Sequence, residues 1–253
     1  MKYTAVVLAG SRPGRDAFAE AHGTDLKALI PVGGEAMVQR PVRALLAAED
    51  VSRVIVLSQA PQRIAAALPD DPLVTMRSSD KTIAETMLEL CFDRETEWPL
   101  LVTTADHALL DTEIIDEFLA YAEGDIAIGV VERATLMRRF PDAKRTWLRF
   151  RGGAYTGANL FALKSPKVAA AIELWRSVEN DRKKGWRVVS LLGPVVLIGT
   201  LLRLLSIDGA LGRTGRKLGL DVRAVRLSNP LAGVDVDKPE DHALAESILA
   251  GRA

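Results

Sequence analysis

The sequence has little of what several classes of protein require. Its single cysteine, Cys91, excludes an intrachain disulfide and a zinc site built from cysteines. Lysine plus arginine number 33 and aspartate plus glutamate also number 33, and this zero formal charge argues against general nucleic-acid binding. No Gly-x-Gly-x-x-Gly motif is present, which leaves a Rossmann-type dehydrogenase with weak support. The N-terminus lacks the apolar core of a signal peptide, which predicts a cytoplasmic protein.

Strands and helices are expected to alternate along the chain, because short apolar runs are separated by amphipathic stretches. The expected strands are 5–8, 54–57, 73–76, 99–104, 125–131, 155–163 and one from 222, and the expected helices are 35–48, 61–68, 82–92, 112–122 and one from 239. This order predicts an α/β fold with a Rossmann-like, doubly wound, mostly parallel sheet. With 253 residues, 48% of them apolar, and no internal repeat, we expect a single domain over 1–253.

Residues 133–205 differ in composition and are expected to form an insertion on the acceptor side of this domain. Arginines and aromatic residues fill 133–151, and the Gly-Gly pair at 152–153 predicts a hairpin turn. The arginines favour either a solvated hairpin face or a second anion site for a phosphorylated acceptor. The stretch 188–205, from Val188 to Leu205, is the most apolar of the chain, but it is too short and too interrupted for a comfortable transmembrane helix. It predicts either buried or homodimer-interface helices or a contact with a membrane surface, which would make the protein membrane-associated.

A loop rich in glycine and arginine follows the first expected strand. It contains Gly10, Arg12, Gly14 and Arg15, and Lys27 follows before a second apolar step. Glycines allow close backbone approach with N–H groups turned outward, and cationic side chains suit a polyphosphate. Two further polar segments, at 77–81 and 103–107, also follow expected strands. Because ligands bind at the carboxyl ends of strands in such sheets, the three segments predict one shared site.

Three aspartates are candidates for a metal site. Asp106 follows an apolar strand, where a carboxylate is costly unless it faces solvent or binds a partner. Asp235 and Asp237 alternate with valines, which directs both to the same side of a strand. Carboxylates close to a polyphosphate loop form a hard oxygen site suited to Mg2+. Each aspartate alone is also explained as a turn or cap residue, and Asp237 in particular as the N-cap of the last helix.

These residues together resemble a known family. Leu8-Ala9-Gly10, the loop arginines and Lys27 resemble the signature of MobA-like and sugar-phosphate nucleotidyltransferases, which have a glycosyltransferase-A-type fold. The segments 102–106 and 233–241 resemble the family's metal-binding segment and its closing motif. The resemblance implies that the nucleotide meets Leu8, Ala9, Gly10, Ser11, Gly14, Ser78, Ser79, Lys81, Thr82 and Thr104, that Lys27, Arg15 and Arg12 stabilise charge, that Asp106 with Asp235 or Asp237 binds Mg2+, and that 156–159 lies beside the acceptor.

The implied reaction is an in-line attack by an acceptor phosphate on the α-phosphorus of a nucleoside triphosphate, with pyrophosphate leaving. By resemblance alone, CTP is favoured over GTP and UTP as the triphosphate. The acceptor, a phosphorylated small molecule, needs no side-chain base because it is already anionic. Neither His22 nor His107 is therefore required as a catalyst, and whether His107 contacts the acceptor stays open.

Two rival functions stay open at this point. A glycosyltransferase that uses a nucleotide-sugar donor would share the carboxylates but would have little need for a polyphosphate loop with Lys27. A non-catalytic regulator would bind a nucleotide without a reaction, and it would tolerate loss of the Asp106 carboxylate.

Overall fold

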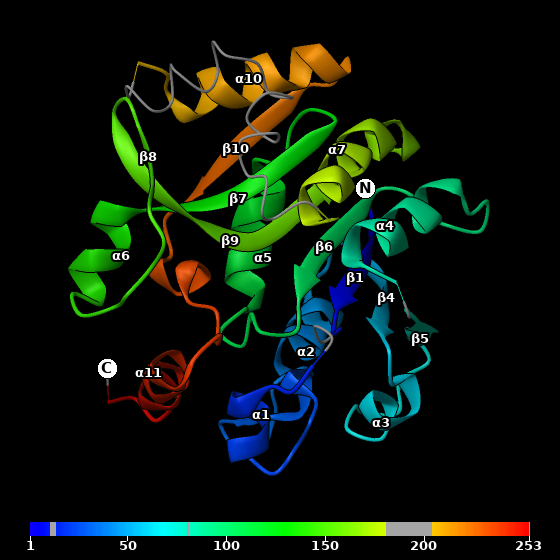
Figure 1. Ribbon diagram of the computed structural model, residues 1–253, viewed down its shortest axis with the longest axis vertical. Coiled ribbons are helices and arrows are strands. Elements are labelled where there is room, and N and C mark those ends of the chain that lie inside the picture. The colour runs from blue at the N-terminus through cyan, green and yellow to red at the C-terminus, as the bar shows by residue number, and fades with distance from the viewer. Residues whose placement is uncertain (11–13, 80, 181–203, 253) are drawn as a thin grey trace.

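The computed structural model describes residues 1–10, 14–79, 81–180 and 204–252, and Figure 1 shows its strands and helices. The strands are β1 (Tyr3–Leu8), β2 (Pro31–Val32), β3 (Glu35–Ala36), β4 (Val51–Ser58), β5 (Val74–Ser78), β6 (Leu100–Thr104), β7 (Ile126–Glu132), β8 (Leu148–Phe150), β9 (Gly153–Leu163) and β10 (Val222–Leu227). The α-helices are α1 (Ala17–Ala21), α2 (Gln39–Ala47), α3 (Pro61–Ala65), α4 (Ile83–Phe92), α5 (Thr112–Ala120), α6 (Arg133–Arg139), α7 (Ala169–Asn180), α10 (Ile207–Leu218) and α11 (Pro239–Leu249). Short 3-10 helices include η1 (Lys27–Leu29), η2 (Pro166–Val168) and η4 (Pro230–Gly233).

One eight-stranded sheet forms the centre of the protein. Its strand order is β10-β7-β9-β6-β1-β4-β5, and β8 pairs with β9 off this path. The strands β1, β4, β5 and β6 are parallel, and so are β7 and β10, whereas β9 runs antiparallel to its neighbours β6 and β7. The predicted Rossmann-like, mostly parallel sheet is therefore confirmed, and β9 is the strand that joins its two parallel groups.

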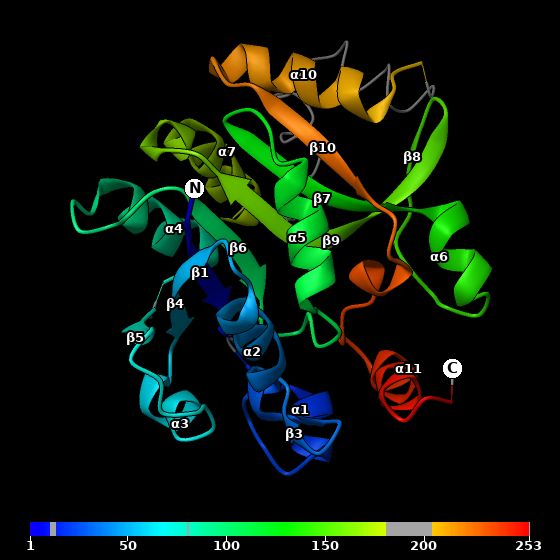
Figure 2. The same cartoon turned by 180° about the vertical axis from the view of Figure 1, so that it is seen from behind.

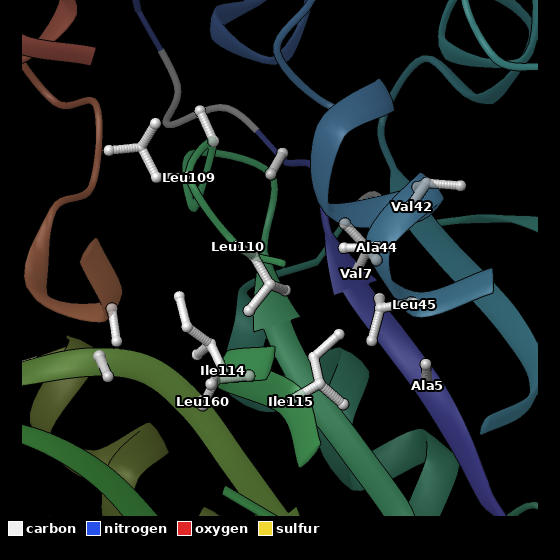
Figure 3. Packing of buried hydrophobic residues seen from close by; sticks show 14 of the residues in the cluster. Ala5, Val7, Val42, Ala44, Leu45, Leu109, Leu110, Ile114, Ile115 and Leu160 are labelled. Carbon is white, nitrogen blue, oxygen red and sulfur yellow. The ribbon is translucent and has the colours of Figure 1, made fainter. Parts of the chain in front are cut away.

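Helices cover both faces of this sheet. Along β1, Ala5 and Val7 belong to the apolar cluster that includes α2 and α5, whereas Val6 and Leu8 belong to the cluster that includes α4 and α7. Figure 3 shows Leu45 of α2 beside the β1 residues of the first cluster. Figure 1 shows α4 and α7 on the near face of the sheet, and Figure 2 shows α2 and α5 on the opposite face. Burial on both faces explains why β1 is a continuous apolar run in the sequence.

Most expected elements are confirmed, but the helix predicted over 35–48 begins later. Glu35–Ala36 pairs with Pro31–Val32 as the small antiparallel hairpin β3–β2, and α2 starts only at Gln39. Val42, Leu45 and Leu46 keep the predicted helical spacing within α2, whereas Met37 and Val38 precede the helix, so the error lies in its first turn. Gly33 and Gly34 both adopt positive φ in the hairpin turn, a conformation that glycine adopts without steric cost.

The closing segment also differs from its prediction. The cap position of α11 is Lys238, not Asp237, and no side chain caps the helix. Residues 234–237 belong to no strand, although they are part of an extended connection between η4 and α11. The predicted strand alternation of Asp235 and Asp237 is therefore wrong as secondary structure.

The predicted insertion is described only in part. Its hairpin is confirmed, because β8 pairs with β9 and Phe150 lies opposite Gly153. The apolar stretch 188–205 lies outside the described residues except for Leu204 and Leu205. Among the residues that the structure describes, no helix is long and apolar enough to span a bilayer.

The carboxyl ends of the central strands meet at one edge of the sheet. Leu8 pairs with Thr104, and the Ala105 N–H donates to the Leu8 carbonyl at 3.0 Å. The Ala9 N–H donates to the Leu57 carbonyl at 2.9 Å, so the chain leaving β1 lies between the ends of β4 and β6. This geometry places the segments after β1 and β6 next to each other.

Candidate active site

A lysine and two aspartates meet at this edge of the sheet. The Lys27 ammonium, at the start of η1, donates to Asp106 Oδ2 at 2.7 Å and also to Asp237 Oδ1. The lysine side chain is 20% exposed, so its charge is mostly enclosed by its partners. The site therefore joins three segments that lie far apart in the sequence.

Hydrogen bonds fix both aspartates independently of the lysine. Thr104 Oγ1 donates to Asp106 Oδ1 at 2.5 Å, and the Val236 N–H donates to the Asp106 carbonyl at 2.9 Å. The Asp237 N–H donates to Asp241 Oδ2 at 3.2 Å. The closing segment is thus attached by its backbone to the loop after β6, which brings the two carboxylates within reach of one cation.

The lysine remains a cation in this environment. Burial alone lowers the pKa of Lys27, but the charges of Asp106 and Asp237 and their hydrogen bonds outweigh it, and the net pKa is raised. Lys27 therefore supplies a fixed positive charge at neutral pH and is not a general base.

A second cation, Arg145, holds the other face of the closing segment. Its side chain is 6% exposed, pairs with Asp235 Oδ1, lies 3.1 Å from Asp241 Oδ1, and donates to the Asp235 carbonyl at 3.2 Å. Asn159 Nδ2 donates to Asp235 Oδ2 at 3.3 Å. Both oxygens of Asp235 are thus engaged by protein groups.

The groups around Asp235 have opposing effects on the pKa of its carboxyl. Burial raises the pKa of its carboxyl, Arg145 opposes this shift, and the nearby carboxylates Asp106 and Asp237 raise the pKa further. Asn159, which faces it from β9, has a φ of 48°, a left-handed conformation uncommon outside glycine. Such backbone conformations concentrate at functional sites, where the surrounding structure holds them.

His107 lies next to Asp106 in sequence but inside the protein. It is 1% exposed, and burial lowers the pKa of its imidazole to about 4, so the ring is neutral at physiological pH. Its Nδ1 lies 3.4 Å from Thr103 Oγ1. A contact between His107 and an acceptor is excluded by this burial, and the residue has a structural role.

The loop after β1, predicted to hold the phosphates, is described only at its two ends. Ser11 and Arg12 lie outside the described residues. Gly10 and Gly14 are exposed, and Gly14 has a φ of 112°, which requires glycine. Arg15 faces outward and pairs with Glu20 at 2.7 Å, so in this structure it does not contact Lys27 or the aspartates. Among the signature residues, Leu8 and Ala9 are buried side chains of the core.

The residues predicted to meet the base lie at the end of β5, which is separated from β6 by β1 and β4. Ser78 ends the strand and is exposed, whereas the Ser79 N–H donates to the Ser58 carbonyl at 2.9 Å. Thr82 caps α4 in a capping box with Glu85, and Lys81 pairs with Glu89. These side chains share the carboxyl edge with the lysine cluster, but those of Thr82 and Lys81 are engaged by α4.

The carboxylates offer a cation the chemistry that Mg2+ prefers. Asp106 and Asp237 each direct one oxygen to the same ammonium, and oxygen ligands of this kind are typical of Mg2+ sites. Asp237 is the more accessible, with a side chain 54% exposed against 29% for Asp235. Within the described part of the chain, no group of three or more His, Cys, Asp or Glu forms a ready-made metal cage. The residues therefore fit a metal held by two carboxylates together with a phosphorylated ligand.

Two residues of this site were not predicted from the sequence. Arg145 was interpreted only as part of an arginine-rich stretch, and Asn159 only as part of a strand beside the acceptor. The positive φ of Asn159 leaves no trace in the sequence beyond the residue type, since asparagine tolerates that conformation better than most residues.

The sequence and the structure were compared with known proteins. Residues 5–193 match the profile of the MobA-like NTP transferase domain. No curated protein matches the chain. A solved structure described as a hypothetical transferase from Thermus thermophilus is 33% identical, with a TM-score of 0.81 over 96% of this chain and 100% of that one.

More distant structures share the fold alone. A 4-diphosphocytidyl-2C-methyl-D-erythritol synthase from Anaerococcus prevotii is 12% identical with a TM-score of 0.61, covering 98% of this chain and 96% of its own. A CMP:2-keto-3-deoxy-manno-octonic acid synthetase complexed with CTP is 13% identical with a TM-score of 0.58, covering 100% of both chains.

Arg145→Gln is expected to lower the free energy of unfolding by about 3 kcal/mol, because it leaves the carboxylates of Asp235 and Asp241 without their counter-charge. Urea denaturation measures this loss. The matched control is Arg77→Gln, which breaks a 2.8 Å ion pair with Asp93 whose side chains are about one-third exposed. It should cost less than about 1 kcal/mol. Equal losses in the two variants would contradict a special role for Arg145.

Stability should fall as the pH falls from 6.5 toward 4, because the unfolded chain takes up a proton on His107 that the folded protein, with a pKa of about 4, resists. Above pH 6.5 this contribution is fully present. His107→Gln removes it, and should therefore reduce the loss of unfolding free energy between pH 7 and pH 4.5 by an amount on the order of 3 kcal/mol or less. Urea denaturation at both pH values tests this. Parallel pH dependences for the variant and the wild type would show that His107 is not responsible.

Proposed function

The chain belongs to the MobA-like NTP transferase family, and from this premise we propose that it transfers a nucleoside monophosphate from a nucleoside triphosphate to a phosphorylated small molecule, releasing pyrophosphate. The observation that carries the proposal is the meeting of Lys27, Asp106 and Asp237 beside the chain that leaves β1. A fixed cation and exposed carboxylate oxygens at one strand edge suit polyphosphate chemistry, in which positioning and charge compensation supply most of the catalysis.

Asp106 and Asp237 are proposed as the residues that hold Mg2+. Asp235 is the weaker candidate because Arg145 and Asn159 already engage both its oxygens. When bound, the metal would offset the negative charge of the phosphates. Thr104, through its bond to Asp106 Oδ1, orients that carboxylate.

Lys27 is proposed to change partners when a triphosphate binds. In the structure its ammonium compensates the two carboxylates. Close to the triphosphate it would donate to an α-phosphate oxygen and stabilise the charge that develops there. The backbone N–H groups of 10–15 and the side chains of Arg12 and Arg15 would hold the remaining phosphates, which requires Arg15 to leave Glu20.

CTP is the proposed triphosphate. The names of two structures with the same fold refer to cytidylyl compounds, which supports CTP over GTP and UTP. The segment from Ser78 to Thr82 would face the base or ribose from the end of β5. The strand β9, with Gly157 and Asn159, would border the acceptor. A homodimer and a cytoplasmic location remain part of the proposal.

Nucleoside triphosphates should raise the thermal midpoint of the protein in a metal-dependent way, with CTP giving the largest shift. Asp106→Asn should abolish the metal dependence, and Lys167→Ala, which removes a surface ion pair with Asp125, is the control that should keep it. A shift with nucleotide-sugars and none with any triphosphate would favour the glycosyltransferase. Triphosphate binding by wild type, with no pyrophosphate released from the triphosphate in the presence of any acceptor, would favour the regulator.

Lys27→Ala should have opposite effects on the two ligands. It should slow nucleotidyl transfer by orders of magnitude and weaken triphosphate binding, because the α-phosphate loses its cation. In the absence of nucleotide it should bind Mn2+, used as a probe for Mg2+, about tenfold or more tightly than wild type, since no ammonium competes for the carboxylates. Titration followed by electron paramagnetic resonance measures free Mn2+. Lys167→Ala, which removes an exposed partner of Asp125, is the control, and unchanged Mn2+ affinity in Lys27→Ala would reject the exchange of partners.

A further inference from the structure

The basic residues of the chain are unevenly distributed. Residues 133–151 contain seven lysines and arginines and one acid, Asp142, whereas the whole chain is formally neutral. This segment forms α6, the following loop and β8. A local excess of positive charge of this size affects which partners the surface attracts, and it is not explained by the fold.

Six of these seven cations are exposed to solvent. They are Arg133, Arg138, Arg139, Lys144, Arg149 and Arg151. Within the described part of the chain, Arg138, Lys144, Arg149 and Arg151 form no ion pair with a carboxylate, and Arg133 lies 6.0 Å from the Trp147 ring centroid. The exception is Arg145, which is enclosed at the candidate active site. The exposed charges therefore form a surface that the site has not used.

Apolar side chains are exposed at the same hairpin. Leu148 of β8 is 56% exposed and Leu204 is 61% exposed. The Arg151 N–H donates to the Leu205 carbonyl at 2.8 Å, which places Leu204 beside the end of the hairpin. Exposed leucines close to exposed cations match the boundary between anionic headgroups and acyl chains.

We propose that α6, the β8–β9 hairpin and Leu204 form a docking surface for an anionic lipid bilayer. Figures 1 and 2 show α6 and β8 on one side of the molecule, with α3 and β5 on the other, so docking would leave the second side facing solution. Charge complementarity favours an anionic surface, and the exposed leucines favour a bilayer over a nucleic acid. This proposal is independent of the nucleotidyl transfer.

The docking surface is connected to the candidate active site through the chain. Arg145 lies between the exposed Lys144 and Trp147, and it is anchored on Asp235 and Asp241. A docked protein would therefore hold its closing segment close to the bilayer. If the proposed transfer is also correct, the acceptor would be a phosphorylated group carried at a lipid surface, a refinement that rests on the proposed function.

The test is co-sedimentation of the full chain with vesicles of phosphatidylcholine, with and without phosphatidylglycerol. Wild type should bind only the anionic vesicles, and less as salt is added. Each basic residue near an anionic surface strengthens binding by about fivefold. A variant with Arg138, Arg139, Arg149 and Arg151 changed to Gln should therefore lose binding by on the order of several hundredfold, and Leu148→Ser should cause a smaller loss.

The matched control changes Arg43, Arg63, Arg94 and Arg223 to Gln, which removes the same charge from other exposed positions and should leave vesicle binding within a few-fold of wild type. Replacement of the four docking arginines by Lys keeps the charge and should preserve binding, so the proposal stays testable if the Gln variant folds poorly. Undiminished binding of a folded Gln variant, equal binding to uncharged vesicles, no vesicle binding by wild type, or a preference for a single-stranded oligonucleotide over the vesicles would each overturn the proposal. None of these measurements uses a nucleotide, so their failure would be distinct from a failure of the transfer reaction.

Discussion

The contact of the Lys27 ammonium with Asp106 and Asp237 is the interaction on which the architecture of the site depends. The backbone bond between Val236 and Asp106 brings the closing segment against the loop after β6, and four aspartates then share a small volume with two cations. Mutual repulsion would separate these carboxylates if no cation were present, since like charges a few ångströms apart cost several kcal/mol in a partly buried site. The position of η1 is thus set by electrostatics as well as by the burial of Ala28 and Ile30.

The two cations, Arg145 and Lys27, have different roles because their side chains differ in chemistry and in exposure. Arg145 is planar and enclosed, and its guanidinium reaches Asp235 and Asp241 together, which suits a permanent structural link. Lys27 carries a compact charge on a flexible stem, so it can exchange a carboxylate for a phosphate without rearrangement of the backbone. The same difference separates the aspartates: Asp235 is bound to Arg145 and Asn159, whereas Asp237 is accessible.

The sequence was sufficient for the fold because the strands buried on both faces are continuous apolar runs, as β1 and β6 show. The contact of Lys27 with Asp106 agrees with the predicted convergence of polar segments at the carboxyl ends of the strands, whereas the roles of these residues stay predictions. The alternation with valines offered Asp235 and Asp237 together, and the contacts of the two side chains distinguish them. The predicted start of α2 was wrong because local spacing cannot show that residues 35–36 pair with another strand. The predicted cap of α11 was wrong because local spacing cannot show that Asp237 contacts the distant Lys27. Arg145 could not be predicted because its partners lie 90 positions or more away in the sequence. In addition, it is one of several basic residues in its segment, and the sequence does not distinguish it from the exposed ones.

The antiparallel strand β9 explains why the basic surface and the candidate active site lie in the same region of the protein. Because β9 runs antiparallel to β6 and β7, it begins at the edge of the sheet where those strands end. At this edge β8 pairs with the first residues of β9, and the loop that carries Arg145 comes just before β8. The closing segment is thereby held from one side by β6 through Asp106 and from the other by the hairpin loop through Arg145. Adsorption of the hairpin to a charged surface would reach Asp235 through the buried guanidinium of Arg145 and through Asn159 of β9, and Asp237 is only two residues farther along the chain. The ion pairs of Arg145 that stabilise the fold therefore also connect the basic surface with the lysine cluster.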